Sequence, residues 1–192
     1  MKNWITACFA VLFLQGCSSG INLDEHFSLN GEVSPLQAQN QNGEAFSTEA
    51  MEDEIWLASF IFTQCDTVCS PMTYNMTELQ EQLDQEDLDY RLVSFTIDPE
   101  QDTPEVLQKF GEQFGADFTN WDFVSGYEQT EIELFANRGF LAPAAKLEGS
   151  DQFVHSSQLY LMVGDRILEQ YEMSMDVPYE EIVEAVELLQ DY

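Results

Sequence analysis

The sequence predicts one α/β domain, a sheet packed between helices. Two observations carry this prediction. Apolar runs of strand length alternate with segments of helical periodicity, and this alternation continues along most of the 192 residues. No repeat or low-complexity segment divides the chain, and its length suits a single core. We therefore expect one domain over residues 31–192.

The first buried strand is expected at residues 55–62, a continuous apolar run that is rich in aromatic side chains. Such runs are typical of central strands covered on both faces. A polar loop follows, and residues 72–83 then carry apolar side chains at helical spacing. This part of the chain predicts a strand that leads through a loop into a helix.

A second strand is predicted at residues 91–97, followed by a helix that begins at Thr103 and Pro104. Threonine is a favoured N-cap residue, and proline is favoured in the first helical turn. Gly115 is expected to end this helix. A short strand and another helix follow, at residues 121–124 and 128–137.

Hairpins are predicted near both ends of the domain. Residues 31–48 alternate in polarity around Asn42-Gly43, a strong turn signal. Residues 153–163 and 167–171 form the second hairpin, and a last amphipathic helix covers residues 179–189. This order of elements describes a thioredoxin-like sandwich with an added N-terminal β-hairpin.

The charge of the chain is strongly negative. It holds 36 acidic and 6 basic residues, a formal net charge of −30. Nucleic acids and anionic lipid headgroups bind to clustered Lys and Arg, so we expect neither as a partner. The acidic residues are dispersed, which favours a solvated acidic surface.

The N-terminus resembles the leader of a bacterial lipoprotein. Lys2 precedes an apolar run at residues 5–14, which is too short to span a bilayer but suits a signal peptide. The run ends in a Leu-Gln-Gly-Cys sequence, so residues 1–16 are predicted to be removed and Cys17 to be lipidated. Residues 17–30 would then be a linker, anchored to the extracytoplasmic side of the cell membrane. An ordinary secretory signal is the alternative.

Cys65 and Cys69 are the two thiols left for chemistry, because Cys8 leaves with the signal peptide and Cys17 carries lipid. They lie between a strand and a helix, where α/β sheets place reactive groups. A helix N-terminus lowers the pKa of a thiol, so a lowered thiol pKa is expected. In an exported protein this pair could form a disulfide, a redox pair or a metal site.

Only two histidines could add a nitrogen ligand, and they differ in context. His26 lies in the predicted linker, whereas His155 lies where an acidic loop enters a strand. Soft thiolates select Cu(I), zinc or iron–sulfur clusters, and two thiolates with one imidazole suit copper. We therefore expect His155, rather than His26, to join the two cysteines.

These motifs together resemble the Sco/SenC family, in particular the lipoproteins of Gram-positive bacteria. The resemblance covers nearly the whole mature chain. It is carried by FTQC and CSPM around the two cysteines, by SFTIDP with DTP, and by FVH leading into LYL. One departure is that Asp66 and Ser70 follow the cysteines, where many family members have proline.

The resemblance implies a thioredoxin-like domain that binds copper through Cys65, Cys69 and His155. It implies a role in maturing the binuclear copper centre, CuA, in subunit II of cytochrome c oxidase. Asp98 matches an acidic position near the metal loop and is an outer-shell candidate; a turn residue before Pro99 is the equal alternative.

Three functions stay open for the cysteine pair. The first is a copper metallochaperone without turnover of its own, so that no residue is assigned a catalytic role. The second is a thiol–disulfide reductase, in which Cys65 and Cys69 cycle through a disulfide and keep the CuA cysteines reduced. The third is a permanent disulfide, which a loop so short would make only weakly stabilising. His155 discriminates between the first two, because only the chaperone needs it.

Overall fold

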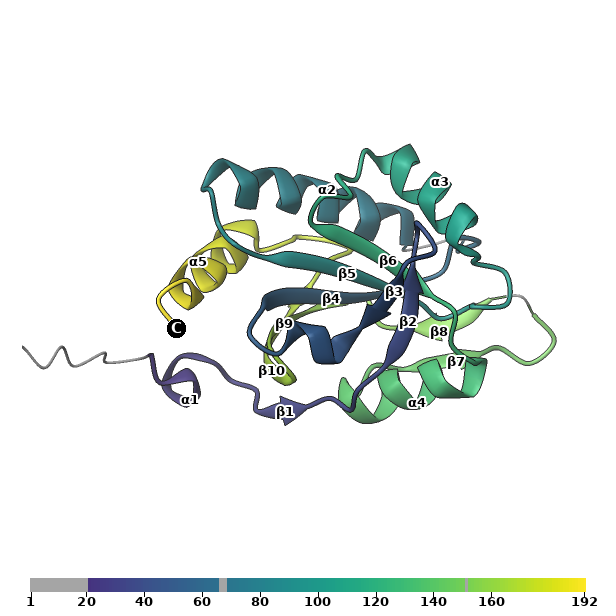
Figure 1. Cartoon of the computed structure of the whole chain (residues 1–192), viewed down its shortest axis with the longest axis horizontal. Helices are drawn as coiled ribbons and strands as arrows, with labels where there is room; N and C mark the ends of the chain where they lie inside the picture. The colour runs from purple at the N-terminus through teal and green to yellow at the C-terminus, as the bar shows by residue number, and fades with distance from the viewer. Residues whose placement is uncertain (1–20, 66–68, 151) are drawn as a thin grey trace, which may run out of the picture.

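The computed structural model describes residues 21–65, 69–150 and 152–192, apart from the side chain of His155. Figure 1 shows the arrangement of its helices and strands. The strands are β1 (Gly31–Glu32), β2 (Gln37–Asn40), β3 (Ala45–Ser47), β4 (Ile55–Ile61), β5 (Arg91–Thr96), β6 (Trp121–Ser125), β7 (Ala144–Lys146), β8 (Phe153–His155), β9 (Gln158–Val163) and β10 (Arg166–Glu172). The helices are α1 (Leu23–His26), η1 (Thr48–Met51), α2 (Cys69–Gln85), α3 (Pro104–Phe114), α4 (Gln129–Gly139) and α5 (Tyr179–Leu189).

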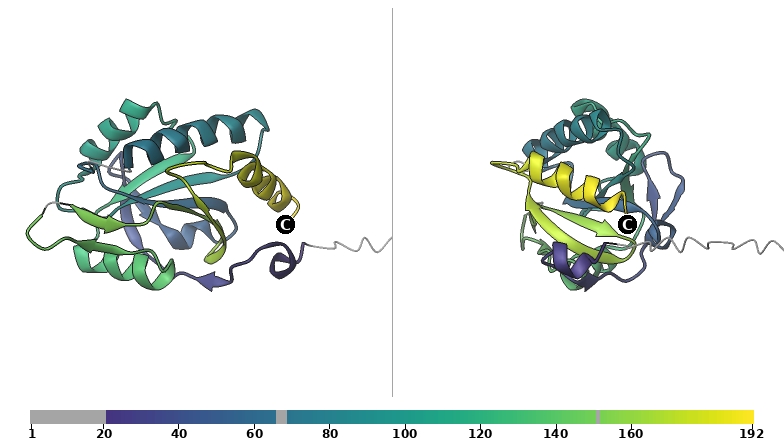
Figure 2. Two further views of the ribbon diagram at one scale, coloured as in Figure 1. Left: turned by 180° about the vertical axis from the view of Figure 1, so that it is seen from behind. Right: turned by 90° about the vertical axis from the view of Figure 1, so that its left-hand side faces the viewer.

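Eight strands form the main sheet, in the order β1-β10-β9-β4-β5-β6-β2-β3. The central strands β4, β5 and β6 run parallel, whereas β9 pairs antiparallel with β4. Helices α2, α3 and α5 lie over one face of this sheet and α4 lies over the other (Figures 1 and 2). The predicted thioredoxin-like sandwich is confirmed.

The N-terminal hairpin is also confirmed, and it extends one edge of the sheet. Strands β2 and β3 pair with each other, and β2 pairs with β6. Gly43 lies in the turn with φ of 75°, a left-handed conformation that favours glycine. The short β1 pairs instead with β10, at the opposite edge of the sheet.

The packed part of the chain begins before the predicted start at Gly31. Leu23 in α1 is buried, and the backbone N–H of Leu29 donates to the carbonyl of Leu168 in β10. The Ser28 hydroxyl also lies 2.8 Å from the Glu169 carboxylate. Residues 23–29, which lie within the predicted linker, thus pack and hydrogen-bond against β10 and the core.

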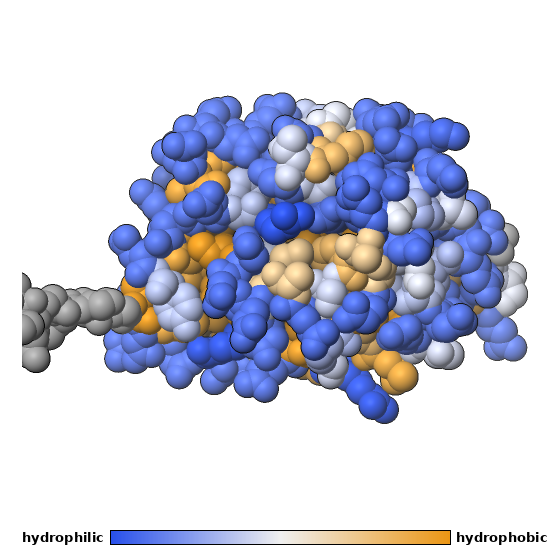
Figure 3. All heavy atoms as spheres, in the orientation of Figure 1, coloured by the Kyte–Doolittle hydropathy of each residue, from blue (hydrophilic) through white to orange (hydrophobic). Residues whose placement is uncertain are grey.

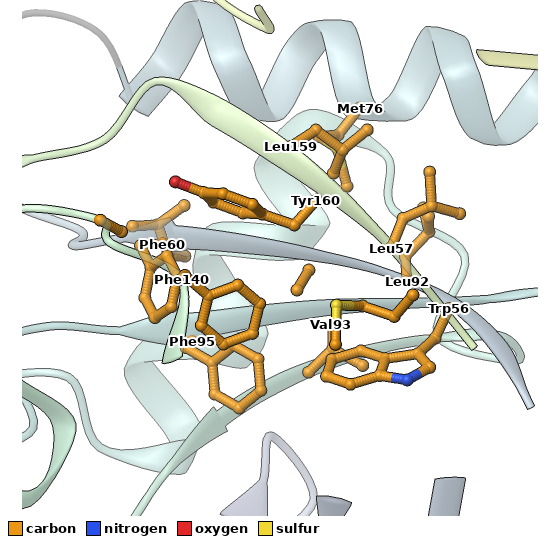
Figure 4. Packing of buried hydrophobic residues seen from close by; sticks show 14 of the residues in the cluster. Trp56, Leu57, Phe60, Met76, Leu92, Val93, Phe95, Phe140, Leu159 and Tyr160 are labelled. Atoms are coloured by element: carbon orange, nitrogen blue, oxygen red, sulfur yellow. The ribbon is translucent and has the colours of Figure 1, made fainter. Parts of the chain in front are cut away.

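The core lies on both faces of the central strands. Figure 4 shows Met76 of α2 beside Leu159 on one side of the sheet. On the other side, the Phe60 ring stacks on Phe95 at 5.7 Å and meets the edge of Phe140 at 5.1 Å. These residues come from β4, β5, β9, α2 and the end of α4, which explains why the apolar runs predicted these elements.

The predicted C-terminal hairpin is divided in the structure. Residues 153–163 form two strands, β8 and β9, separated at Ser156 and Ser157. Strand β9 continues to β10 through a turn at Gly164, as predicted. Strand β8 instead pairs with β7, a strand that the sequence did not predict.

Two further features concern the hydropathy of the helices and of the surface. Within the residues that the structure describes, no helix is both long and apolar enough to cross a membrane. Figure 3 shows one face that is mostly hydrophilic, with apolar side chains in scattered patches. This surface agrees with the strongly acidic composition.

Candidate metal centre

The two cysteines lie at the carboxyl edge of the parallel strands. Strand β4 ends at Ile61, and the loop after it turns so that the backbone N–H of Cys65 donates to the carbonyl of Phe62 at 3.3 Å. Cys69 is the first residue of α2. The predicted placement between a strand and a helix is confirmed, although the helix begins three residues earlier than its apolar periodicity indicated.

The backbone N–H of Cys69 donates to the Sγ atom of Cys65 at 3.4 Å. This contact brings one sulfur to the N-terminus of a helix of 17 residues, where the helix dipole favours negative charge. Cys65 is half-buried, whereas Cys69 is 1% exposed. The two thiols therefore differ in their access to solvent and to a partner.

The pKa of the Cys69 thiol is raised well above its usual range, contrary to the lowered value expected from the sequence. Its hydrogen bond with Cys65 is the main cause, burial is the next, and the nearby Asp102 carboxylate adds to the shift. A neighbouring sulfur, burial and a carboxylate all oppose a second negative charge. A cation that binds both sulfurs would have to displace the proton of Cys69.

Asp102 holds the start of the cysteine loop. Its carboxylate accepts hydrogen bonds from the backbone N–H of Thr63 at 3.1 Å and from the hydroxyls of Thr63 and Thr96. The side chain is fully buried, and burial raises its pKa. Asp102 therefore links Thr63, two residues before Cys65 in the loop after β4, to Thr96 at the end of β5.

Asp98, the outer-shell candidate, follows β5 at the same edge of the sheet. It is 3% exposed, and its carbonyl accepts from the backbone N–H of Asp102 at 2.9 Å. The N–H of Ile97 donates to the carbonyl of Ile61 at 2.8 Å, so the end of β5 lies beside the end of β4. This places Asp98 and the cysteine loop on adjacent strand ends.

His155 is the last residue of β8, in a small two-stranded sheet with β7. Two side-chain contacts link this sheet to the cysteine loop. The rings of Phe62 and Phe153 lie 5.3 Å apart, and the side-chain amide of Gln152 donates to the carbonyl of Gln64 at 3.0 Å. The structure thus brings the strand that carries His155 to the loop that carries Cys65.

Two of the predicted site groups lie outside the part of the chain that the structure describes. They are Cys17 and the side chain of His155; Asp66, the residue after Cys65, is not described either. Among the side chains that are described, no three of His, Cys, Asp or Glu converge closely enough to hold a metal ion. For His26, the structure shows a position at the end of α1.

Asp102 and Phe153 belong to the DTP and FVH motifs, but their contacts with the cysteine loop, like that of Gln152, were not predicted from the sequence. For Asp102, its spacing of four from Asp98 after a buried strand was a usable signal. Gln152 and Phe153 gave no such signal, because their partners Gln64 and Phe62 are far away in the chain.

Sequence and structure comparisons with known proteins point to one family. Residues 28–189 match the family SCO1/SenC. The chain is 44% identical over 183 residues to a SCO1 protein homolog of Bacillus subtilis, covering 95% of this chain and 93% of that protein. It superimposes with a TM-score of 0.81 on a SCO1/SenC family lipoprotein from Bacillus anthracis, at 36% identity, covering 84% of this chain and 96% of that one.

A further solved relative is BsSco, described as having a disulfide switch and as a member of the Sco family of cytochrome c oxidase assembly proteins. It is 46% identical, with a TM-score of 0.77, and the match covers 83% of this chain and 93% of that one. A protein of Stutzerimonas stutzeri named for copper binding is 30% identical over 134 residues, 69% of this chain and 65% of that protein. ScoI of Bradyrhizobium japonicum, solved with copper bound, shares the fold with a TM-score of 0.67 at 20% identity, over 81% of this chain and 99% of that one. The chain belongs to the SCO1/SenC family.

Proposed function

We propose that this protein binds copper through Cys65, Cys69 and His155 and serves assembly of the CuA centre in subunit II of cytochrome c oxidase. The observation that carries the proposal is the Cys69 N–H on the Cys65 sulfur, which gathers both cysteines at one helix N-terminus. The family gives this geometry its context, because relatives are named for copper binding and for oxidase assembly.

The donor set fits copper. Two thiolates and one imidazole are soft and borderline ligands that copper prefers over hard oxygen sets. Cys65 and Cys69 come from a loop and a helix start, and β8 brings the backbone of His155 to the same loop through its neighbours Gln152 and Phe153. Copper is the cargo in this proposal: the thiols would lose their protons to solvent when copper binds and take protons up again when it is released.

Asp98 is proposed as an outer-shell group. Its buried carboxylate follows β5 beside the end of β4, so it can act on the site through charge and hydrogen bonds. Asp102 adds a second buried carboxylate that holds Thr63. Two buried acidic residues at this edge of the sheet would favour a bound cation and disfavour two thiolates without one.

The proposal includes a tether to the membrane. Cys17 would carry lipid, and residues 1–16 would be removed as a signal peptide. Helix α1 lies at one end of the molecule, whereas β7, β8 and the start of α2 lie toward the other (Figures 1 and 2). A tether before α1 would therefore leave the cysteine loop turned away from the membrane, toward an extracytoplasmic partner.

A thiol–disulfide reductase is the second candidate, and one observation favours it. Cys65 is half-buried and Cys69 is fully buried, as suits an attacking sulfur and a resolving sulfur. Cys65 would attack a disulfide of the target, and Cys69 would release the target by forming a disulfide with Cys65. Two electrons and two protons pass to the target, which leaves with two thiols.

Titration of the reduced full chain with Cu(II), in detergent, tests the proposal. A stoichiometric sulfur-to-copper charge-transfer band is expected, lost or weakened in Cys65→Ala, Cys69→Ala and His155→Ala. The matched control is His26→Ala, which should leave the band unchanged. Absence of the band in reduced wild-type protein would overturn the copper site. Reduction of an oxidised subunit II fragment that survives in His155→Ala would favour the reductase.

A further inference from the structure

Strand β8 is attached to the rest of the molecule in an unusual way. In the described part of the chain, β7 and β8 pair with each other and not with the main sheet. The chain leaves β8 through Ser156 and Ser157 and only then enters β9, whose backbone bonds with β4 begin at Ala58 and Tyr160. Backbone pairing within the main sheet therefore does not fix the direction of β8.

Side chains supply the missing connection at the cysteine loop. Phe153 is buried, and its ring lies 5.3 Å from that of Phe62, the residue after β4. Lys146 of the paired strand β7 places its Nζ atom 5.5 Å from the centre of the Phe153 ring. Ring pairs and cation–π contacts of this kind each add to the stabilisation that burial provides.

Gln152 makes the second connection. Its side-chain amide donates to the backbone carbonyl of Gln64 at 3.0 Å, across 88 positions of the chain. Gln64 immediately precedes Cys65, so this hydrogen bond joins the residue before Cys65 to the residue before β8. It therefore fixes the separation of the two segments next to the candidate ligands.

The spacing along β8 links these contacts to His155. Residues two apart in a strand share a face, so position 155 belongs to the same face of β8 as Phe153. Val154, between them, is 45% exposed. The face of β8 that packs toward the cysteine loop is thus the face to which position 155 belongs.

We propose that Gln152 and Phe153 are positioning residues, which hold β8 against the cysteine loop so that His155 meets Cys65 and Cys69. The inference rests on the proposed copper function, but it assigns these two residues a role that the ligand set alone does not contain. A ligand held near its binding geometry loses less conformational freedom when copper binds. Loss of either contact should therefore weaken copper binding and speed copper release.

The test compares Gln152→Ala with Val154→Ala in the reduced full chain, in detergent. Gln152 is partly exposed and makes one hydrogen bond to the loop, so its loss should spare the fold. We expect Gln152→Ala to weaken Cu(II) binding by about 3- to 10-fold, measured by competition with a chelator, and to speed copper release by a similar factor. Val154→Ala should stay within about twofold of wild type, because Val154 is exposed.

A second pair of variants separates positioning from general destabilisation. If Gln152 acts through His155, then adding Gln152→Ala to a His155→Ala chain should change copper affinity by less than about twofold. An equal loss in both backgrounds would overturn the proposal, and so would unchanged binding and release in Gln152→Ala. Phe153→Leu, which keeps an apolar side chain, should likewise weaken copper binding in the wild-type background and change it by less than about twofold in the His155→Ala background.

Hydrogen exchange of the copper-free chain gives a readout that does not depend on copper. Gln152→Ala should speed exchange of the backbone amides of residues 153–155, and Val154→Ala should not. If exchange is faster in Gln152→Ala but the wild-type protein binds no copper, the contact between Gln152 and the loop is supported and the proposed function is overturned. Unchanged exchange would overturn the positioning role, whatever the copper titration shows.

Discussion

The Sγ atom of Cys65 lies 3.4 Å from the backbone nitrogen of Cys69, which donates a hydrogen bond to it as the first residue of α2. A backbone donor at a helix N-terminus stabilises negative charge on sulfur without adding a side chain to the site. The same arrangement raises the pKa of the Cys69 thiol through its contact with Cys65 and through burial. The helix N-terminus therefore favours negative charge on the Cys65 sulfur, whereas burial and the Cys65 contact oppose it on Cys69.

Copper should stabilise the folded protein. A ligand at about 100 times its dissociation constant adds ~2.7 kcal/mol to the free energy of unfolding. For a domain of this size we expect Tm to rise by about 5–10 °C, as measured by calorimetry of the reduced chain. A chelator should reverse the rise. The Cys65→Ala, Cys69→Ala double variant is the control, and an equal rise in that variant would contradict binding at the cysteines.

Asp102→Ala should destabilise the protein and weaken copper binding together. The substitution leaves the buried hydroxyl of Thr96 and both donors of Thr63 without their acceptor, which should lower the free energy of unfolding by about 2–4 kcal/mol. Urea unfolding and Cu(II) titration would measure the two effects. Glu100→Ala, an exposed acidic neighbour, should change stability by less than about 0.5 kcal/mol. Equal effects of the two variants would contradict the role of Asp102.

Glu172→Gln should reduce stability at neutral pH but not in acid. Burial raises the pKa of this carboxyl, but hydrogen bonds from Ser174, Ser157 and Gln158 outweigh burial and lower it overall. A lowered folded-state pKa gives stability that is present above the unfolded pKa, about 4.3, and is lost as pH falls through the folded value.

The loss at pH 7 should be no more than about 1 kcal/mol, because solvent screens this partly exposed group. Urea unfolding at pH 7 and near pH 3 would measure it, with the exposed Glu187→Gln as control. A difference between wild type and Glu172→Gln that persists in acid would show that charge is not its source.

Ser94→Ala should cost more stability than Ser59→Ala. The two hydroxyls lie 2.9 Å apart in the core, and Ser94 also accepts from the indole N–H of Trp121 at 3.0 Å. Ser94→Ala leaves that buried N–H without its acceptor and should cost about 1–3 kcal/mol. Ser59→Ala keeps the indole bond and should cost less. Urea unfolding measures both, and the reverse order would contradict this account.

Gly164→Ala should be more destabilising than Gly43→Ala. Both glycines have left-handed backbones, with φ of 58° and 75°, so both substitutions should cost about 1 kcal/mol in backbone strain. At Gly164 a new Cβ would also lie 2.5 Å from the carbonyl oxygen of Glu52, whereas at Gly43 it meets no described atom within 4 Å. Thermal unfolding compares them, and equal losses would show that the chain near Glu52 moves aside.

The sequence by itself determined the α/β class and most of the elements. Periodicity and apolar runs depend on neighbours along the chain, so β4, β5, α3 and α5 lie where residues 55–62, 91–97, 103–115 and 179–189 predicted them. The apolar runs on either side of Cys65 and Cys69 likewise predicted that the two cysteines lie between a strand and a helix.

Tertiary structure alone decided the rest, because the decisive contacts join residues that are distant in sequence. Leu23 lies within residues 17–30, where a linker was expected, but its side chain is buried in the hydrophobic core. The pKa of Cys69 rises because burial and Cys65 outweigh the helix N-terminus that predicted a lowered value. Strand β8 reaches the cysteine loop through Gln152 and Gln64, 88 positions apart. No local pattern in the sequence records that contact, because folding alone brings the two residues together.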